Sequence, residues 1–169
     1  SFMDALRDAQ ALMAHEPRSI ETVDSKVLTL ARQDLVWQGI AEYFPSDDAQ
    51  EAMGINLVEF CGDDEAALMR RVETFCSDIS AGSGTLRLGY TVAKTPAAVE
   101  RIYSMRKRAV GLLGNSPGEA RPQPFVEDTA VPPEHLADYI AEFRALLDSH
   151  GVAYGMFGHV DAGVLHVRP

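Results

Sequence analysis

The closing stretch of the chain, "YGMFGHVDAGVLHVRP" (residues 154–169), is the feature that most limits how the chain can fold. Two strand-like runs flank a turn that contains Gly163, and this pattern predicts a β-hairpin. The two strands of a hairpin run antiparallel, so the sheet that contains them cannot be purely parallel. The hairpin also places one histidine on each side of its turn, His159 and His166.

The rest of the chain alternates between helical and strand patterns. Helical periodicity predicts helices over residues 4–14, 63–79, 95–113 and 132–151, and a short strand that turns into a helix over 19–32. Branched and aromatic residues or alternation predict strands over 55–62, 85–93 and 125–131. Residues 38–53 have weak periodicity and are predicted to be a loop or a short irregular helix. Asp63 and Thr95 are placed to cap the helices that follow them.

This order of elements predicts an α+β fold. We expect a ferredoxin-like split βαβ arrangement, with a mostly antiparallel sheet and helices packed on one face. The 169 residues, with a mass of 18.4 kDa, are enough for one domain with a sizeable core, so a single domain is expected over residues 1–169. The last predicted strand runs to the end of the chain, which predicts a fragment of a longer protein.

Charge and cysteine content exclude several classes of protein. The net charge of −10 argues against nucleic-acid binding, because phosphate recognition needs a basic face. Cys61 and Cys76 each lie within an apolar pattern and indicate no disulfide framework. No apolar run approaches the roughly 20 residues of a membrane helix, and the start of the chain has no signal-peptide pattern. We therefore expect a soluble, acidic, cytoplasmic protein.

The two histidines of the hairpin are candidate metal ligands. A loop of two or four residues would place His159 directly opposite His166, with Cβ atoms about 4.5–5.5 Å apart. Two imidazoles at that spacing can share a divalent ion, although a third protein ligand is then needed. A three-residue loop would put the histidines on opposite faces. The alternative is that both are ordinary strand histidines, one solvated and one packed beside Phe157.

Arg106 is the second candidate. On a helical wheel it falls at the centre of the apolar face of its helix, and a guanidinium that points inward is costly unless an anion meets it. Arginine suits a carboxylate, which it can hold through two parallel hydrogen bonds. Two alternatives stay open: an internal glutamate or aspartate could satisfy Arg106, or the side chain could extend outward near the end of its helix.

Residues 125–169 resemble the C-terminal substrate, or cap, domain of FAD-linked oxidases. These are D-lactate and D-2-hydroxyglutarate dehydrogenases of the vanillyl-alcohol-oxidase type. The resemblance continues through "RIYSMRKRAV" (101–110), "INLVEFCGDDEA" (55–66) and "PRSIETVDSKVL" (17–28), and so covers nearly the whole chain. It is most similar to the large bacterial dehydrogenases that are fused to an iron–sulfur region. Its most specific part is a Gly-His-x-x-x-Gly-x-x-His pattern, formed here by Gly158, His159, Gly163 and His166.

The resemblance implies an activity, the FAD-dependent oxidation of D-2-hydroxyglutarate or D-lactate to the 2-oxo acid. In metal-dependent members the two histidines bind a zinc-like ion, and His159 and His166 match them as metal ligands and catalytic residues. The ion would polarise the substrate hydroxyl so that a base can take its proton as hydride passes to the flavin. The family's "W-x-x-R" arginine, which grips a substrate carboxylate, matches Arg106, with Tyr103 at the aromatic position.

The chain departs from the family pattern in two places. The family commonly has Gly-Asp-Gly-Asn between its histidines where this chain has "DAGV", so a polar contact near Val164 is lost. Arg168 stands where some members carry an asparagine, which makes it a candidate substrate-binding residue that shifts the substrate preference.

The resemblance also implies partners outside these residues. A flavin domain of the same parent chain would hold most of the FAD, a "GEHG"-like segment would add an acidic metal ligand, and an iron–sulfur cluster would lie in the parent chain. The fragment is therefore expected to be inactive alone. The parent could form a homo-oligomer and lie peripherally at the inner membrane face.

Two functions of other classes stay open. One is a freestanding ferredoxin-like module that binds a small ligand or a partner and has no redox role. The other is a metal-dependent hydrolase, which would need further carboxylate ligands near the two histidines; the sequence shows none.

Overall fold

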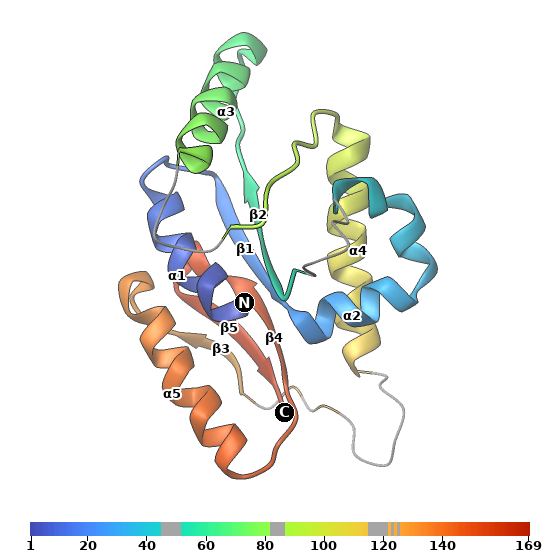
Figure 1. Ribbon diagram of the computed structural model, residues 1–169, viewed down its shortest axis with the longest axis vertical. Helices are drawn as coiled ribbons and strands as arrows, with labels where there is room; N and C mark the ends of the chain where they lie inside the picture. Colours follow the sequence, from blue (N-terminus) through green and yellow to red (C-terminus); the bar gives the residue numbers. More distant parts are fainter. Residues whose placement is uncertain (45–51, 82–86, 115–121, 123, 125) are drawn as a thin grey trace.

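A five-stranded antiparallel sheet forms the centre of the computed structural model (Figure 1). The structure describes residues 1–44, 52–81, 87–114, 122, 124 and 126–169. In chain order the strands are β1 (Ser19–Asp24), β2 (Gly54–Glu59), β3 (Val126–Ala130), β4 (Gly155–His159) and β5 (Val164–Arg168). Their order across the sheet is β2-β1-β4-β5-β3, and every neighbouring pair is antiparallel. The predicted α+β class and the antiparallel sheet are confirmed.

The helices and strands follow the predicted pattern along the chain with two differences. The bounds of the helices are α1 (Phe2–Met13), α2 (Ser25–Gln33), α3 (Glu65–Ser80), α4 (Pro96–Gly114) and α5 (Leu136–Ser149), with short 3₁₀ turns at Leu35–Gly39, Ala41–Tyr43, Pro133–His135 and Val160–Ala162. Thr95 caps α4 as predicted, because its hydroxyl accepts a hydrogen bond from the Ala98 backbone N–H. The prediction that Asp63 caps α3 is wrong, since Asp64 accepts the bond from the Ala67 N–H at 3.0 Å.

The second difference concerns the strand predicted over residues 85–93. Residues 85 and 86 lie outside the described part of the chain, and residues 87–93 join no strand of the sheet. Leu88 and Tyr90 are about half exposed there. Alternation of apolar and polar residues gives a segment the right chemistry for a strand, but a strand also needs a neighbouring strand to pair with.

The split βαβ arrangement is present at one end of the sheet. β3 and β4 are each antiparallel to β5, which lies between them, so β3 and β4 run parallel to each other. Helix α5 connects them in the sequence. This unit brings the two strands of the closing hairpin, β4 and β5, into the middle of the sheet.

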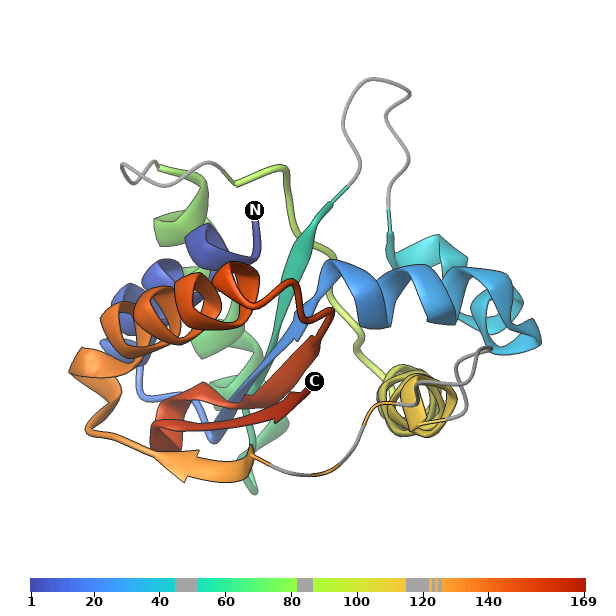
Figure 2. The same cartoon turned by 90° about the horizontal axis from the view of Figure 1, so that it is seen from below.

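The helices cover both faces of the sheet, rather than the single face that the sequence suggested. On one face Ile20, Met156 and Leu165 pack against α1 and α5. On the other, Val23 and Phe157 pack against α2 and α4. In Figure 1 the first helix pair lies to the left of the strands and the second to the right; Figure 2 shows the same separation from below. Helices cover both faces because residues 20–24 of β1 are all buried, so both faces of this strand must be packed against other elements.

None of the described helices is long and apolar enough to cross a membrane. Among the described residues the two cysteines are unpaired, as expected.

Glycine is required in the turn that joins β4 to β5. A 3₁₀ turn over Val160–Ala162 ends at Gly163, whose φ of 70° lies in the left-handed region that favours glycine. A Cβ atom at this position would also collide with the backbone carbonyl of Val131. The Gly163 carbonyl in turn accepts a hydrogen bond from the Val131 N–H at 3.0 Å, which joins the turn to the segment after β3.

Replacing Gly163 by alanine should therefore lower the free energy of unfolding by about 2 kcal/mol or more, from backbone strain and the collision together. Gly111→Ala is the matched control, since Gly111 lies within α4 and a Cβ there meets nothing within 4 Å. That change should raise stability by about 0.5–1 kcal/mol. Urea unfolding of the two variants measures both effects, and equal changes would contradict this account of the turn.

Asp24 ties the end of β1 to two other elements. Its Oδ1 accepts a hydrogen bond from the Val27 N–H at 2.9 Å and caps α2, while its Oδ2 accepts one from the Met156 N–H at 2.7 Å and fixes β4. The carboxyl is buried, and burial raises its pKa above the usual 3.8, although both hydrogen bonds act to lower it.

The raised pKa of Asp24 predicts the direction in which the free energy of unfolding changes with pH. The folded protein binds the Asp24 proton more tightly than the unfolded chain does, so the contribution of this group is fully present below pH 3.8 and is lost as the pH rises through the raised value. The difference in unfolding free energy between the native chain and Asp24→Asn should therefore shrink as the pH rises across that window. Urea titrations at a series of pH values measure it. A difference that grows with pH would show that the two hydrogen bonds outweigh burial.

Candidate functional site

The register of three strands brings the two histidines onto one face of the sheet. Glu21 of β1 lies opposite His159 of β4, and Phe157 of β4 lies opposite His166 of β5. Residues that face each other across an antiparallel pair, and residues two apart in one strand, share a face. Glu21, Phe157, His159 and His166 therefore lie on the same face, the one that α2 and α4 partly cover.

The predicted direct opposition of His159 and His166 is wrong. The turn takes up four residues, Val160–Gly163, but Phe157 rather than His159 lies opposite His166, so the pairing is displaced by two positions. A displacement of two keeps every side chain on its face. The histidines are thus diagonal neighbours on one face. Phe157 lies two residues before His159 in β4 and directly opposite His166 in β5.

Glu21 is the buried centre of this face, with 6% of its surface exposed. Its Oε2 lies 2.6 Å from Nε of Arg106 on α4, and its Oε1 lies 3.4 Å from Nδ1 of His159. Arg106 points inward, as the helical wheel predicted, and a glutamate of the same chain meets it. Of the alternatives for Arg106, the internal carboxylate partner is thus the one that the structure shows.

Phe157 links the remaining candidates. Its ring centroid lies 4.8 Å from that of His166, 5.2 Å from the guanidinium carbon of Arg106 and 5.5 Å from that of Arg168. Arg168 also donates a short hydrogen bond from its Nε to Oε1 of Glu127 on β3. All four sequence-predicted site residues, Arg106, His159, His166 and Arg168, therefore gather around Glu21 and Phe157.

A second hydrogen-bonded group borders this face one helical turn before Arg106. The hydroxyl of Tyr103 donates to Oε2 of Glu59 at 3.3 Å, and Ser19 donates to the same oxygen at 3.2 Å. Burial raises the pKa of the Tyr103 hydroxyl, and the carboxylates of Glu59 and Glu21 raise it further. Tyr103 thus remains a neutral hydrogen-bond donor across the physiological pH range.

Sequence reasoning missed Glu21 and Glu127 as site residues. It named Phe157 only as the ring beside which one histidine would pack, and the contact of Phe157 with His166 confirms that packing. Glu21 carried one signal: it is a carboxylate in the middle of a short predicted strand, next to Ile20 and close to Val23. A charge in such a strand needs a partner. Glu127 carried no such signal, because its partner Arg168 is distant in the sequence.

The two histidines fit part of a metal site. A histidine that ligates a metal through one ring nitrogen usually directs the other to a carboxylate, and Nδ1 of His159 lies within ion-pair distance of Glu21, at 3.4 Å from its Oε1. The His159 side chain is 47% exposed, so its outer edge is accessible. Within the described residues, however, no group of three histidine, cysteine or carboxylate side chains could hold a metal ion. A complete site would therefore need a ligand from beyond these residues.

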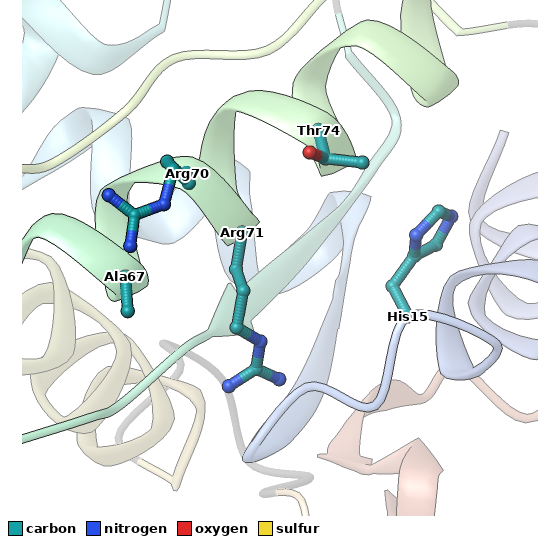
Figure 3. Close-up of a pocket in the computed structure, with 5 residues that line it drawn as sticks. All are labelled: His15, Ala67, Arg70, Arg71 and Thr74. Carbon is teal, nitrogen blue, oxygen red and sulfur yellow. The ribbon is translucent and has the colours of Figure 1, made fainter. Parts of the chain in front are cut away.

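An open surface depression lies elsewhere. It measures about 350 Å³ and is lined by His15, Ala67, Arg70, Arg71 and Thr74 (Figure 3). Arg71 donates to the backbone carbonyl of Glu16 at 2.9 Å and lies over the Phe60 ring, so this cation already serves to fasten α3 to the chain after α1. The depression shares no residue with the sheet face around Glu21, and that face has the stronger claim to be the functional site.

Comparison with known proteins decides the family. The model of the FAD-linked oxidase C-terminal domain matches residues 1–169. The chain belongs to this family. It is 68% identical over 169 residues to the D-2-hydroxyglutarate dehydrogenase of Pseudomonas putida and 59% identical over 172 residues to that of Escherichia coli. A third relative with the same name, from Haemophilus influenzae, is 53% identical over 173 residues.

Each of these alignments covers 100% of this chain but only 17% of the relative, so the FAD-linked oxidase domain described here spans about a sixth of those proteins. The resemblance seen in the sequence is thereby confirmed at the level of the family. The family is named for FAD, which is its cofactor. The comparisons say nothing of the metal ligands or the substrate arginines, which stay predictions.

The role of the Phe157 ring can be tested through Arg106. Phe157→Leu keeps an apolar side chain in the core but removes the ring face, and a cation–π contact contributes about 0.5–1 kcal/mol. A double-mutant cycle with Arg106→Gln should therefore give a coupling energy of that size in urea unfolding. The control is Phe75→Leu, since Phe75 is also buried but packs against His15 and Phe60. A cycle with Phe75 that gave the same coupling would contradict a specific contact.

Proposed function

We propose that this chain is the substrate domain of a longer FAD-dependent dehydrogenase that oxidises D-2-hydroxyglutarate to the 2-oxo acid. The observation that carries the proposal is the pair of arginines, Arg106 and Arg168, held against one Phe157 ring beside His159 and His166. The names of the relatives, which are D-2-hydroxyglutarate dehydrogenases and are several times longer than this chain, support it.

The way in which the two arginines are anchored favours a dicarboxylate. Arg106 and Arg168 each meet a glutamate through Nε. Neither makes a hydrogen bond from its terminal Nη groups to another of the described residues. The Nη edge of a guanidinium matches a carboxylate through two parallel hydrogen bonds. Two such edges on one face suit the two carboxylates of D-2-hydroxyglutarate, whereas D-lactate has only one.

In this proposal His159 and His166 hold a zinc-like divalent ion together with an acidic ligand from another part of the parent chain. The position of His159 supports this role, because Glu21 faces Nδ1 and so favours Nε2 as the ligating nitrogen. A bound ion of this kind supplies Lewis-acid chemistry at the substrate hydroxyl. The chain's own task is to orient the hydroxy acid, through Arg106 at one carboxylate and Arg168 at the other.

The remaining parts of the enzyme belong to the parent chain. FAD, when bound, supplies the acceptor for the hydride that leaves C2 of the substrate. A flavin domain outside these 169 residues would hold it, and an iron–sulfur region of the same chain is part of the proposal because the resemblance is to the large bacterial form. We place the parent protein in the cytoplasm. A freestanding ligand-binding module without redox activity is the alternative that the test must exclude.

The test uses the full-length parent enzyme. Its flavin absorbance should bleach on addition of D-2-hydroxyglutarate and respond weakly to D-lactate. Arg168→Gln should raise KM for D-2-hydroxyglutarate by roughly 10- to 100-fold, the factor that the loss of a hydrogen bond to a charged group gives. The same variant should change KM for D-lactate much less, since that acid lacks the second carboxylate.

A matched control is Arg108→Gln, because Arg108 lies on the same helix as Arg106 but forms an exposed ion pair with Asp34. It should leave both KM values near those of the native enzyme. A protein without flavin absorbance, or one that bleaches with neither acid, would refute the oxidoreductase and leave the binding module.

A further inference from the structure

We propose that Glu21 is a positioning residue that fixes the substrate arginine Arg106 and the proposed metal ligand His159 at the same time. The inference rests on the proposed function of the sheet face. It concerns a residue that neither the sequence pattern nor the family resemblance singled out, and it explains why a buried carboxylate occupies the middle of a central strand.

The surroundings of Glu21 make its charge costly without partners. β1 is paired on both sides, with Leu57 of β2 opposite Glu21 on one side and His159 of β4 on the other. Only 6% of the residue is exposed. A carboxylate removed from water to this degree destabilises a fold unless cations or donors compensate it. Its two oxygens meet two such groups from two different elements, Arg106 of α4 and His159 of β4.

The contact with Arg106 differs from a purely structural ion pair. The chain contains a structural pair for comparison, in which Arg87 uses both Nε and Nη2 to hold the Asp8 carboxylate through hydrogen bonds of 2.6–3.1 Å. Arg106 approaches Glu21 with Nε at 2.6 Å, yet neither atom of that contact makes a hydrogen bond of good geometry. The pair therefore keeps the guanidinium beside the Glu21 carboxylate, and among the described residues no hydrogen bond joins its terminal nitrogens to that carboxylate.

The contact with His159 fixes the orientation of the imidazole. Nδ1 of His159 lies 3.4 Å from Oε1 of Glu21, so a ligand on this imidazole would be bound through the other nitrogen, Nε2. Carboxylates that orient a metal-ligating histidine in this way typically change metal affinity by 10- to 100-fold when they are removed. Because one carboxylate serves both groups, substrate binding and metal binding should weaken together when it is neutralised.

The test compares two variants of the full-length, FAD-loaded enzyme. Glu21→Gln keeps the size of the side chain and removes its charge. Glu127→Gln is the matched control, since Glu127 anchors Arg168 through Nε as Glu21 anchors Arg106 but has no histidine among its contacts with the described residues. Zinc affinity of the metal-free enzyme is measured by competition with a chromophoric chelator, and KM and kcat for D-2-hydroxyglutarate are measured in steady state.

Glu21→Gln should weaken zinc binding by about 10- to 100-fold and also raise KM. Glu127→Gln should raise KM while zinc affinity stays native. Thermal unfolding of the metal-free proteins separates these effects from loss of fold. If Glu21→Gln does not fold, Glu21→Asp, which keeps the charge and shortens the side chain, should show the same joint loss to a smaller extent.

Native zinc affinity and native KM in Glu21→Gln would overturn the inference while leaving the proposed function intact. Equal loss of zinc affinity in both variants would also overturn it, since Glu127 does not contact His159. A native enzyme that neither binds zinc nor oxidises D-2-hydroxyglutarate would instead refute the proposed function itself, and this inference with it.

Discussion

Strand β1 has no face toward water, and the rest of the fold is arranged around that constraint. It pairs with β2 on one side and β4 on the other, and its residues 20–24 are all buried. Ile20 belongs to the core under α1 and α5, and Val23 to the core under α2 and α4. The polar residues of β1 must therefore find partners inside the protein, as Thr22 does with Asn56 and Asp24 with two backbone N–H groups.

Glu21 meets the same requirement with two of the candidate site residues, Arg106 and His159. Arg106 comes from α4 and His159 from the closing hairpin. The elements that pack against β1 or pair with it therefore also supply the side chains that contact Glu21. Phe157 then provides an apolar surface against which Arg106, Arg168 and His166 lie. The core under α4 and the polar site are thus continuous, and the Phe157 ring belongs to both.

The sequence predicted local features well and long-range ones in part. The hairpin, the cap at Thr95 and the inward direction of Arg106 depend on residues close together in the chain, and all three are present. The expectation that helices cover one face was wrong, because it needed knowledge of which strand becomes central. The carboxylate partners of the two arginines lie 85 and 41 positions away in the chain, and no periodic pattern links residues so far apart.

The diagonal placement of the two histidines has a consequence for insertions and deletions in the hairpin. The turn over Val160–Gly163 sets whether His166 and Arg168 share the face of His159. One residue more or fewer would invert β5, sending Leu165 and Val167 to the polar side and His166 and Arg168 into the apolar core. A change of two residues would restore both faces. Insertions or deletions between His159 and His166 should therefore preserve the two faces of β5 only when they change the length by an even number of residues.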